Sequence, residues 1–179
     1  MTGLSVSNVS FAYGSKTALQ DVSFDVPTGT FCALLGPNGA GKSTLFGLLT
    51  RLLTTPEGHI TIAGHNLREA PRLALAKLGI VFQQTTLDMD LSVRQNLSYF
   101  AALHGLSGRA ATMRIDAALD KLSMLERADE KARALNGGHR RRAEIARALI
   151  HDPDVLLLDE ATVGLDAAGA PRFTEIVHH

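Results

Sequence analysis

The chain begins with alternating hydrophobic and polar residues, the pattern of β-strands with one face exposed. Residues 22–26 and 60–62 place apolar side chains at every second position, which predicts half-exposed antiparallel strands. Residues 4–11 follow the same pattern with a slip of one residue near Asn8. Such a slip predicts a β-bulge within the first strand.

Three other segments, residues 31–35, 79–82 and 155–158, are apolar without interruption. Continuous apolar strands are typical of parallel sheets that helices cover on both faces. We therefore expect an α/β core, with an antiparallel layer contributed by the N-terminal part. Cys32, the single cysteine, lies within the first of these segments and is expected to be buried.

The periodicity becomes helical from about Asp88 to Asp152. Apolar residues recur at helical spacing over residues 93–103, directly after Ser92 as a predicted N-cap, and again over residues 115–125. The pattern predicts a helical subdomain, residues 88–152, inserted into an α/β core formed by residues 1–87 and 153–179.

Residues 36–43 read Gly-Pro-Asn-Gly-Ala-Gly-Lys-Ser, between a predicted strand and a predicted helix. This is the Gly-x4-Gly-Lys-Ser pattern in its strand–loop–helix setting. Glycines let backbone N–H groups approach phosphate oxygens, Lys42 can reach the β- and γ-phosphates, and the Ser43 hydroxyl can coordinate Mg²⁺. The segment predicts a site for a nucleoside triphosphate.

A second motif, the acidic pair Asp159-Glu160, follows the apolar segment 155–158. Carboxylates at the carboxyl end of a parallel strand face the ligand crevice of an open sheet. Asp159 is suited to hold Mg²⁺ through water, and Glu160 to orient or deprotonate the attacking water. The alternative is that the pair only caps the next helix. Because the chain also contains the phosphate loop, we favour the role at the nucleotide over this alternative.

Together with further motifs that occur in the family's order, these two motifs make the chain resemble the ATP-binding cassette (ABC) ATPases over nearly its whole length. The resemblance implies an α/β P-loop NTPase core of the RecA type with an N-terminal antiparallel layer and an inserted helical subdomain. It implies that Tyr13 stacks on adenine, that Gln83 forms the glutamine loop, and that Asp166 belongs to the D-loop. Residues 135–139, Leu-Asn-Gly-Gly-His, match the signature motif that meets a partner subunit's ATP.

The candidate site residues follow from these motifs. Lys42, Gln83 and Glu160 are the candidate catalytic residues, and Ser43, Gln83 and Asp159 the candidate metal ligands. The candidate ATP-binding residues are Tyr13, Gly36, Pro37, Asn38, Gly39, Ala40, Gly41, Lys42, Ser43, Thr44, Asn136, Gly137, Gly138, His139 and Asp166.

The chain departs from the family pattern at several positions. Asn136 and His139 stand where the signature usually has Ser and Gln, and Ala161 stands where Pro commonly follows the glutamate. The family's switch histidine should follow a further helix and strand after Glu160, but the sequence ends at His179. We expect His178 and His179 to end a helix rather than to replace that histidine, and we expect the chain as given to hydrolyse ATP poorly.

Charge and composition narrow the functional classes. Lys plus Arg and Asp plus Glu both number 18, so the formal charge is zero, which disfavours a dedicated nucleic-acid-binding protein. No apolar run approaches the roughly 20 residues that span a bilayer. The N-terminus has no charged-then-apolar signal segment. Arg140, Arg141 and Arg142 begin a predicted helix over 140–150, where we expect Arg141 to be solvated and the cluster to face a partner's triphosphate.

We therefore expect the ATP-binding and ATP-hydrolysing subunit of an ABC transporter, using ATP and Mg²⁺. Two copies would close head to tail as a homodimer on the cytoplasmic face of the membrane. Their motion would pass to transmembrane permease subunits. Parts of the sequence look similar to efflux ATPases, and the signature resembles subunits associated with quinoprotein alcohol dehydrogenase systems. Two alternatives remain: a soluble ABC ATPase acting on DNA, which would need a longer coiled coil, and a nucleotide-binding module without turnover.

Overall fold

The computed structural model describes residues 2–159. The chain divides into two compact units, one ending at Leu78 and the other beginning at Gly79. The predicted domain boundaries at residues 88 and 152 stay a prediction.

The first unit is built on a four-stranded antiparallel sheet. Its strands are β1 (Thr2–Tyr13), β2 (Lys16–Pro27), β3 (His59–Ile62) and β4 (His65–Asn66), in the order β2-β1-β3-β4. Val6 is in register with Phe24 on one side and with Ile60 on the other. The register shifts between Val6 and Val9, and Asn8 has a φ of 52°. The predicted antiparallel layer and its bulge are confirmed.

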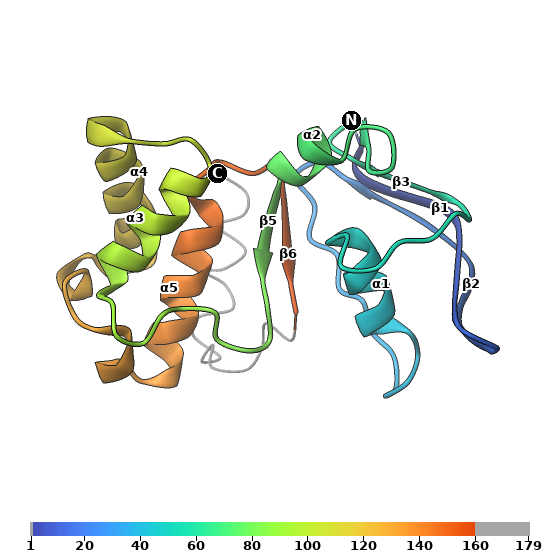
Figure 1. The fold of residues 1–179 in the computed structure, drawn as a ribbon, viewed down its shortest axis with the longest axis horizontal. Helices are drawn as coiled ribbons and strands as arrows, with labels where there is room; N and C mark the ends of the chain where they lie inside the picture. Colours follow the sequence, from blue (N-terminus) through green and yellow to red (C-terminus); the bar gives the residue numbers. More distant parts are fainter. Residues whose placement is uncertain (1, 160–179) are drawn as a thin grey trace. The chain divides into compact units, whose positions relative to one another are not determined.

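Helices α1 (Lys42–Leu49) and α2 (Pro71–Ala76) complete the first unit (Figure 1). The alternation of β1 directs one set of apolar side chains into the core, as the sequence predicts, and α1 adds its own apolar residues to that core. The buried apolar residues of β1, β2, β3, α1 and α2 are Leu4, Val6, Val9, Leu19, Leu45, Leu48, Leu49, Ile60, Ile62 and Ala74.

The apolar segment 31–35, which precedes the phosphate loop, differs from the prediction. It forms no strand, and Phe31, Leu34 and Leu35 are 61%, 54% and 87% exposed. Cys32 is also exposed. The physical reason is that none of the strands within residues 2–159 pairs with this segment, so its backbone has no ladder to join. The prediction of a buried strand and a buried cysteine is wrong for the described structure.

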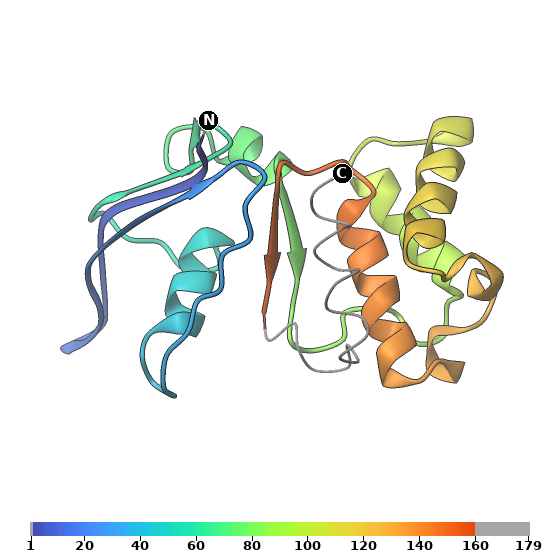
Figure 2. The ribbon, with the colours of Figure 1, turned by 180° about the vertical axis from the view of Figure 1, so that it is seen from behind.

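The second unit contains a two-stranded sheet of β5 (Leu78–Val81) and β6 (Val155–Leu158). Figures 1 and 2 show the two arrows pointing in the same direction. Just beyond the strand end, the Asp159 N–H donates to the Val81 carbonyl at 2.9 Å. The two predicted parallel strands are confirmed.

The rest of the second unit is helical, as predicted. Its elements are α3 (Val93–Leu103), α4 (Gly108–Lys121), the 3-10 turns η1 (Leu125–Arg127) and η2 (Ala132–Ala134), and α5 (Gly137–Leu149). Ser92 caps α3 as expected: its side chain accepts from the Gln95 N–H, and the Gln95 side chain accepts from the Ser92 N–H. Leu97, Leu119 and Ile145 are fully buried where α3, α4 and α5 pack together.

Candidate functional site

The phosphate loop, residues 36–43, turns into α1 through left-handed glycines. Gly39 and Gly41 have φ values of 84° and 85°, and Gly41 is the N-cap of α1. A Cβ at Gly41 would lie 2.6 Å from the Ala18 carbonyl oxygen, whereas a Cβ at Gly39 would meet nothing within 4 Å. Glycine is therefore required at residue 41 both for its φ and for its close approach to a backbone.

The start of α1 offers several hydrogen-bond donors on one loop. The first N–H groups of any α-helix have no intrahelical acceptor. In α1 they also lack a side-chain cap, and the first turn contains no acidic residue. Lys42 Nζ donates back across the loop to the Gly36 and Pro37 carbonyls, at 2.7 and 2.8 Å. Unpaired amides, a helix N-terminus and an ammonium group together fit the phosphates of a nucleotide.

Three predicted binding residues of the first unit, Ser43, Thr44 and Tyr13, lie at the end of this loop or next to it. Ser43 is exposed in the first turn of α1, where a hydroxyl can reach a metal ion, while Thr44 is buried. The Thr44 Oγ1 lies 3.5 Å from the Tyr13 hydroxyl. The Tyr13 ring is 53% exposed and packs edge-on against Phe11 with its centroid 4.9 Å away. Tyr13 thus lies beside the first turn of α1.

In the second unit, Gln83 and Asp159 follow neighbouring parallel strands. Gln83 lies two residues beyond β5 and Asp159 directly after β6, and the Asp159 N–H bonds to the last residue of β5. The structure therefore brings these two predicted metal ligands to the same end of one sheet. Glu160, Ala161, Asp166, His178 and His179 lie outside the described residues.

The signature segment forms the N-terminus of α5. This helix begins at Gly137, three residues before the predicted start, because the Asn136 side chain accepts a hydrogen bond from the His139 N–H at 2.8 Å. The cap uses the Asn136 oxygen, which leaves the amide nitrogen as a donor. Gly137, Gly138 and His139 form the first turn, and a Cβ at Gly137 would meet nothing within 4 Å.

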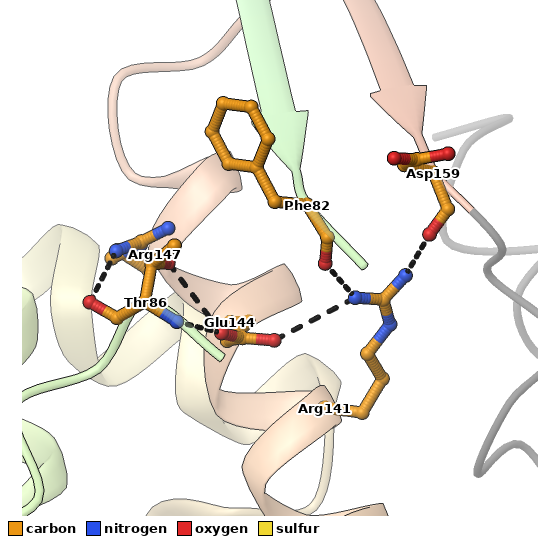
Figure 3. Close-up of polar contacts among 6 residues, drawn as sticks. All are labelled: Phe82, Thr86, Arg141, Glu144, Arg147 and Asp159. Atoms are coloured by element: carbon orange, nitrogen blue, oxygen red, sulfur yellow. Dashed lines mark hydrogen bonds and ion pairs between the residues drawn. The ribbon is translucent and has the colours of Figure 1, made fainter. Parts of the chain in front are cut away.

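A buried polar network on α5 escaped the sequence analysis. Arg141 is only 6% exposed, so the prediction that it is solvated is wrong. Its guanidinium donates to the Phe82 carbonyl and, at 2.8 Å, to the Asp159 carbonyl (Figure 3). Glu144, 2% exposed, accepts from the Thr86 N–H at 2.7 Å and lies 3.6 Å from Arg141 Nη1.

The helical period contained the signal for this burial. Residues 141, 144, 145 and 148 follow i, i+3, i+4, i+7 spacing, and all four are buried. Arg147, one turn beyond Glu144, donates to the Thr86 carbonyl at 3.4 Å and lies over the Phe100 ring at 5.2 Å. Burial lowers the pKa of Arg147.

Residues 2–159 contain neither an acidic or histidine-rich metal cluster nor a membrane-spanning helix. No group of three or more His, Cys, Asp or Glu side chains within residues 2–159 could hold a metal ion. None of the helices described here is both long and apolar enough to cross a bilayer.

Comparisons with known proteins agree with this geometry. The chain is 41% identical to a daunorubicin resistance ATP-binding protein of Streptomyces coeruleorubidus, over 94% of this chain and 53% of that protein. It is 42% identical to the Nod factor export ATP-binding protein I of Burkholderia orbicola, over 89% of this chain and 52% of that protein. The chain thus spans about half the length of these relatives.

A solved structure gives the same result for the fold. The protein cbiO1 from Clostridium perfringens, described as part of the ABC transporter complex cbiONQ, superposes with a TM-score of 0.88 at 30% identity. The alignment covers 98% of this chain and 74% of that one. The predicted P-loop NTPase fold is confirmed. Since the model of the ABC transporter family also matches residues 19–163, the chain belongs to that family.

Proposed function

We propose that this chain binds Mg²⁺-ATP through residues 36–44 and hydrolyses it to drive transport. The observation that carries the proposal is the glycine loop, whose left-handed Gly39 and Gly41 lead into an uncapped α1 beside the Lys42 ammonium. A bound triphosphate would offer Lys42 a charged acceptor in place of two neutral carbonyls. The phosphate would add the attraction of opposite net charges, which a neutral carbonyl does not offer the ammonium group.

Each remaining site residue has a distinct proposed role. Tyr13 stacks on the adenine, and Ser43, Gln83 and Asp159 supply the metal ligands. Mg²⁺, when bound, neutralises charge on the transferred phosphoryl group. Glu160 orients or deprotonates the attacking water, and Gln83 positions that water. The Asn136 amide nitrogen and His139 contact a second copy's ATP, together with Gly137, Gly138 and Asp166.

The transporter role is supported by the printed names of the relatives, which describe drug resistance and Nod factor export ATP-binding proteins. We infer an export-type transporter in which two copies of this chain close head to tail and act on transmembrane permease subunits. Such a subunit would lie on the cytoplasmic face of the membrane, where ATP is available.

The direct test is a titration of the chain with Mg²⁺-ATP, followed by measurement of phosphate release. Lys42→Ala should weaken ATP binding by roughly 10- to 100-fold, because it removes a charge-assisted contact. Lys121→Ala, at an exposed position in the last turn of α4, is the matched control and should bind like the wild type. An unchanged dissociation constant in Lys42→Ala would reject the loop as the nucleotide site. A low rate of phosphate release is expected of residues 1–179, and ATP binding with no detectable phosphate release would reject hydrolysis by them.

A further inference from the structure

We propose that Arg141 and Glu144 are positioning residues for the glutamine loop, residues 82–86. They hold the two ends of this loop and join it to the end of β6. The inference rests on the proposed function, since it assigns these residues to the placement of Gln83 and Asp159. Neither side chain would touch nucleotide. Both act through the backbone of residues that the proposal places at the metal and the attacking water.

Side chains of α5 contact the backbone on either side of Gln83. Arg141 donates to the carbonyl of Phe82, the residue before Gln83, and Glu144 accepts from the N–H of Thr86, three residues after it. Arg147 adds a contact to the Thr86 carbonyl at 3.4 Å. Residues 83–85 are therefore bounded at both ends by side chains from one face of α5, as Figure 3 shows.

The Arg141 guanidinium group is a planar fork that contacts two backbone carbonyls. Arg141 places Nη1 on the Phe82 carbonyl and Nη2 on the Asp159 carbonyl, so one planar group spans the ends of β5 and β6. A lysine ammonium is a point charge on a flexible stem and lacks this fixed two-pronged geometry. A single rigid side chain thus bridges the two carbonyls, next to the hydrogen bond from the Asp159 N–H to the Val81 carbonyl.

The side chains of Arg141 and Glu144 are both buried. Arg141 and Glu144 are the buried charged side chains of residues 2–159, at 6% and 2% exposure. Arg141 Nε is also buried, with no hydrogen-bond partner in that part of the chain. Taking charges out of water is costly, and a buried ion pair often stabilises a fold less than apolar side chains of similar size. A device that fixes geometry explains this arrangement better than one that adds stability.

The consequence is that one helix links three parts of the second unit. The N-terminus of α5 carries the signature residues 136–139, and its next turns hold the glutamine loop and the end of β6. A shift of α5 would therefore move Phe82 and Thr86 with it. The position of Gln83 would therefore change with any contact at residues 136–139 that shifts α5.

Hydrogen exchange of the nucleotide-free chain tests the positioning itself. In Arg141→Lys, amides of residues 82–88 should exchange about tenfold faster or more, while amides of α3 keep their wild-type rate, because local opening precedes global unfolding. Arg109→Lys, at an exposed position on α4, is the matched control and should exchange like the wild type. Unchanged exchange over 82–88, or equal acceleration over α3, would overturn the inference.

Glu144 offers a second and independent readout. Glu144→Gln keeps an oxygen that can accept from the Thr86 N–H, whereas Glu144→Ala does not, so only the alanine variant should lose protection at Thr86. Equal exchange at Thr86 in the two variants would contradict the role of Glu144. If the single variants do not fold, Arg141→Met combined with Glu144→Gln removes both buried charges. In this double variant, amides next to Phe82 should exchange faster than in the wild type, while the Thr86 amide keeps its protection. Faster exchange at Thr86 with unchanged exchange next to Phe82 would contradict the inference.

Turnover distinguishes this inference from the proposed function. Arg141→Lys should bind ATP with a dissociation constant within about twofold of the wild type, since the nucleotide contacts remain, but lose roughly ten- to a hundredfold in kcat through misplacement of Gln83. Wild-type kcat in Arg141→Lys would overturn the positioning role. A wild-type chain that neither binds nor hydrolyses ATP would instead defeat the proposed function, and the exchange measurements would still decide whether α5 holds the loop.

Discussion

Gly41 shows how a single residue can be fixed by two separate constraints. Its φ of 85° favours glycine, and a Cβ there would lie 2.6 Å from both the Ala18 carbonyl oxygen and a Leu19 methyl carbon. Backbone at this distance cannot move aside cheaply. The residue before Lys42 therefore controls the direction in which α1 leaves the phosphate loop.

Gly41→Ala should lower the free energy of unfolding and weaken ATP binding at the same time. Left-handed backbone alone costs a non-glycine residue about 1–2 kcal/mol, and the contact with Ala18 adds to this. Gly64→Ala is the control, since Gly64 has a φ of 81° and nothing within 4 Å of its Cβ position. Thermal unfolding and Mg²⁺-ATP titration of both variants provide the measurement. Equal losses of stability would show that the close approach is unimportant.

The candidate site was partly predictable at the residue scale. Lys42, Ser43 and the loop glycines follow from a local pattern, because the chemistry of phosphate binding requires those residue types at that spacing. Arg141 was misjudged because its charge and its place near a helix start favoured solvent, although its helical period placed it on the apolar face. Its partners are carbonyl groups, and a sequence pattern does not show where backbone carbonyls lie.

At the scale of elements, α3 depends on its capping box. Ser92→Ala should destabilise the chain by about 1 kcal/mol, the usual cost of losing an N-cap. Ser107→Ala is a matched control, because Ser107 occupies the N-cap position of α4 without a side-chain hydrogen bond to the helix. Chemical denaturation of the two variants compares the caps. A Ser107→Ala loss as large as that of Ser92→Ala would contradict the assignment.

The other end of α3 predicts a dependence on pH. The His104 ring stacks on His151 at 4.1 Å and lies 4.6 Å from Phe100, and burial lowers the pKa of His104 from its ordinary value of 6.5. The unfolded chain then takes up a proton more readily than the folded one, so the free energy of unfolding should fall as pH drops below about 6.5. His104→Gln should reduce this dependence in thermal unfolding between pH 7.5 and 5. A variant that matches the wild type at every pH would refute the explanation.

The elements themselves were predictable to different degrees. The helices between 88 and 152 and the antiparallel strands follow from local periodicity, and the structure confirms them. The segment 31–35 was predicted as a strand from its apolar character alone. A strand also needs a ladder partner from elsewhere in the chain, and no strand within residues 2–159 pairs with this segment.

At the scale of the whole molecule, the proposed head-to-tail dimer predicts complementation. Gly137→Glu should fit the fold, since a Cβ there meets nothing within 4 Å. Its carboxylate would repel a second copy's triphosphate at the start of α5. Lys42→Ala and Gly137→Glu should each hydrolyse ATP poorly, while a mixture of the two should recover part of the activity, because a mixed dimer contains one intact site.

Two controls accompany this experiment. Gly137→Gln has nearly the same shape without the charge and should retain more activity than Gly137→Glu. Sedimentation of the mixture with ATP measures the dimer directly. A mixture no more active than its two components would argue that each copy completes its own site.

The exposed segment before the phosphate loop also makes the chain accessible to a simple chemical probe. Cys32 is the single cysteine of the sequence and is exposed four residues before Gly36. A maleimide dye or nitroxide would therefore attach at one known position without any substitution. The rate of that reaction measures how far residues 31–35 are covered in any longer form or complex of the protein, and the attached label would report nucleotide entering the adjacent loop.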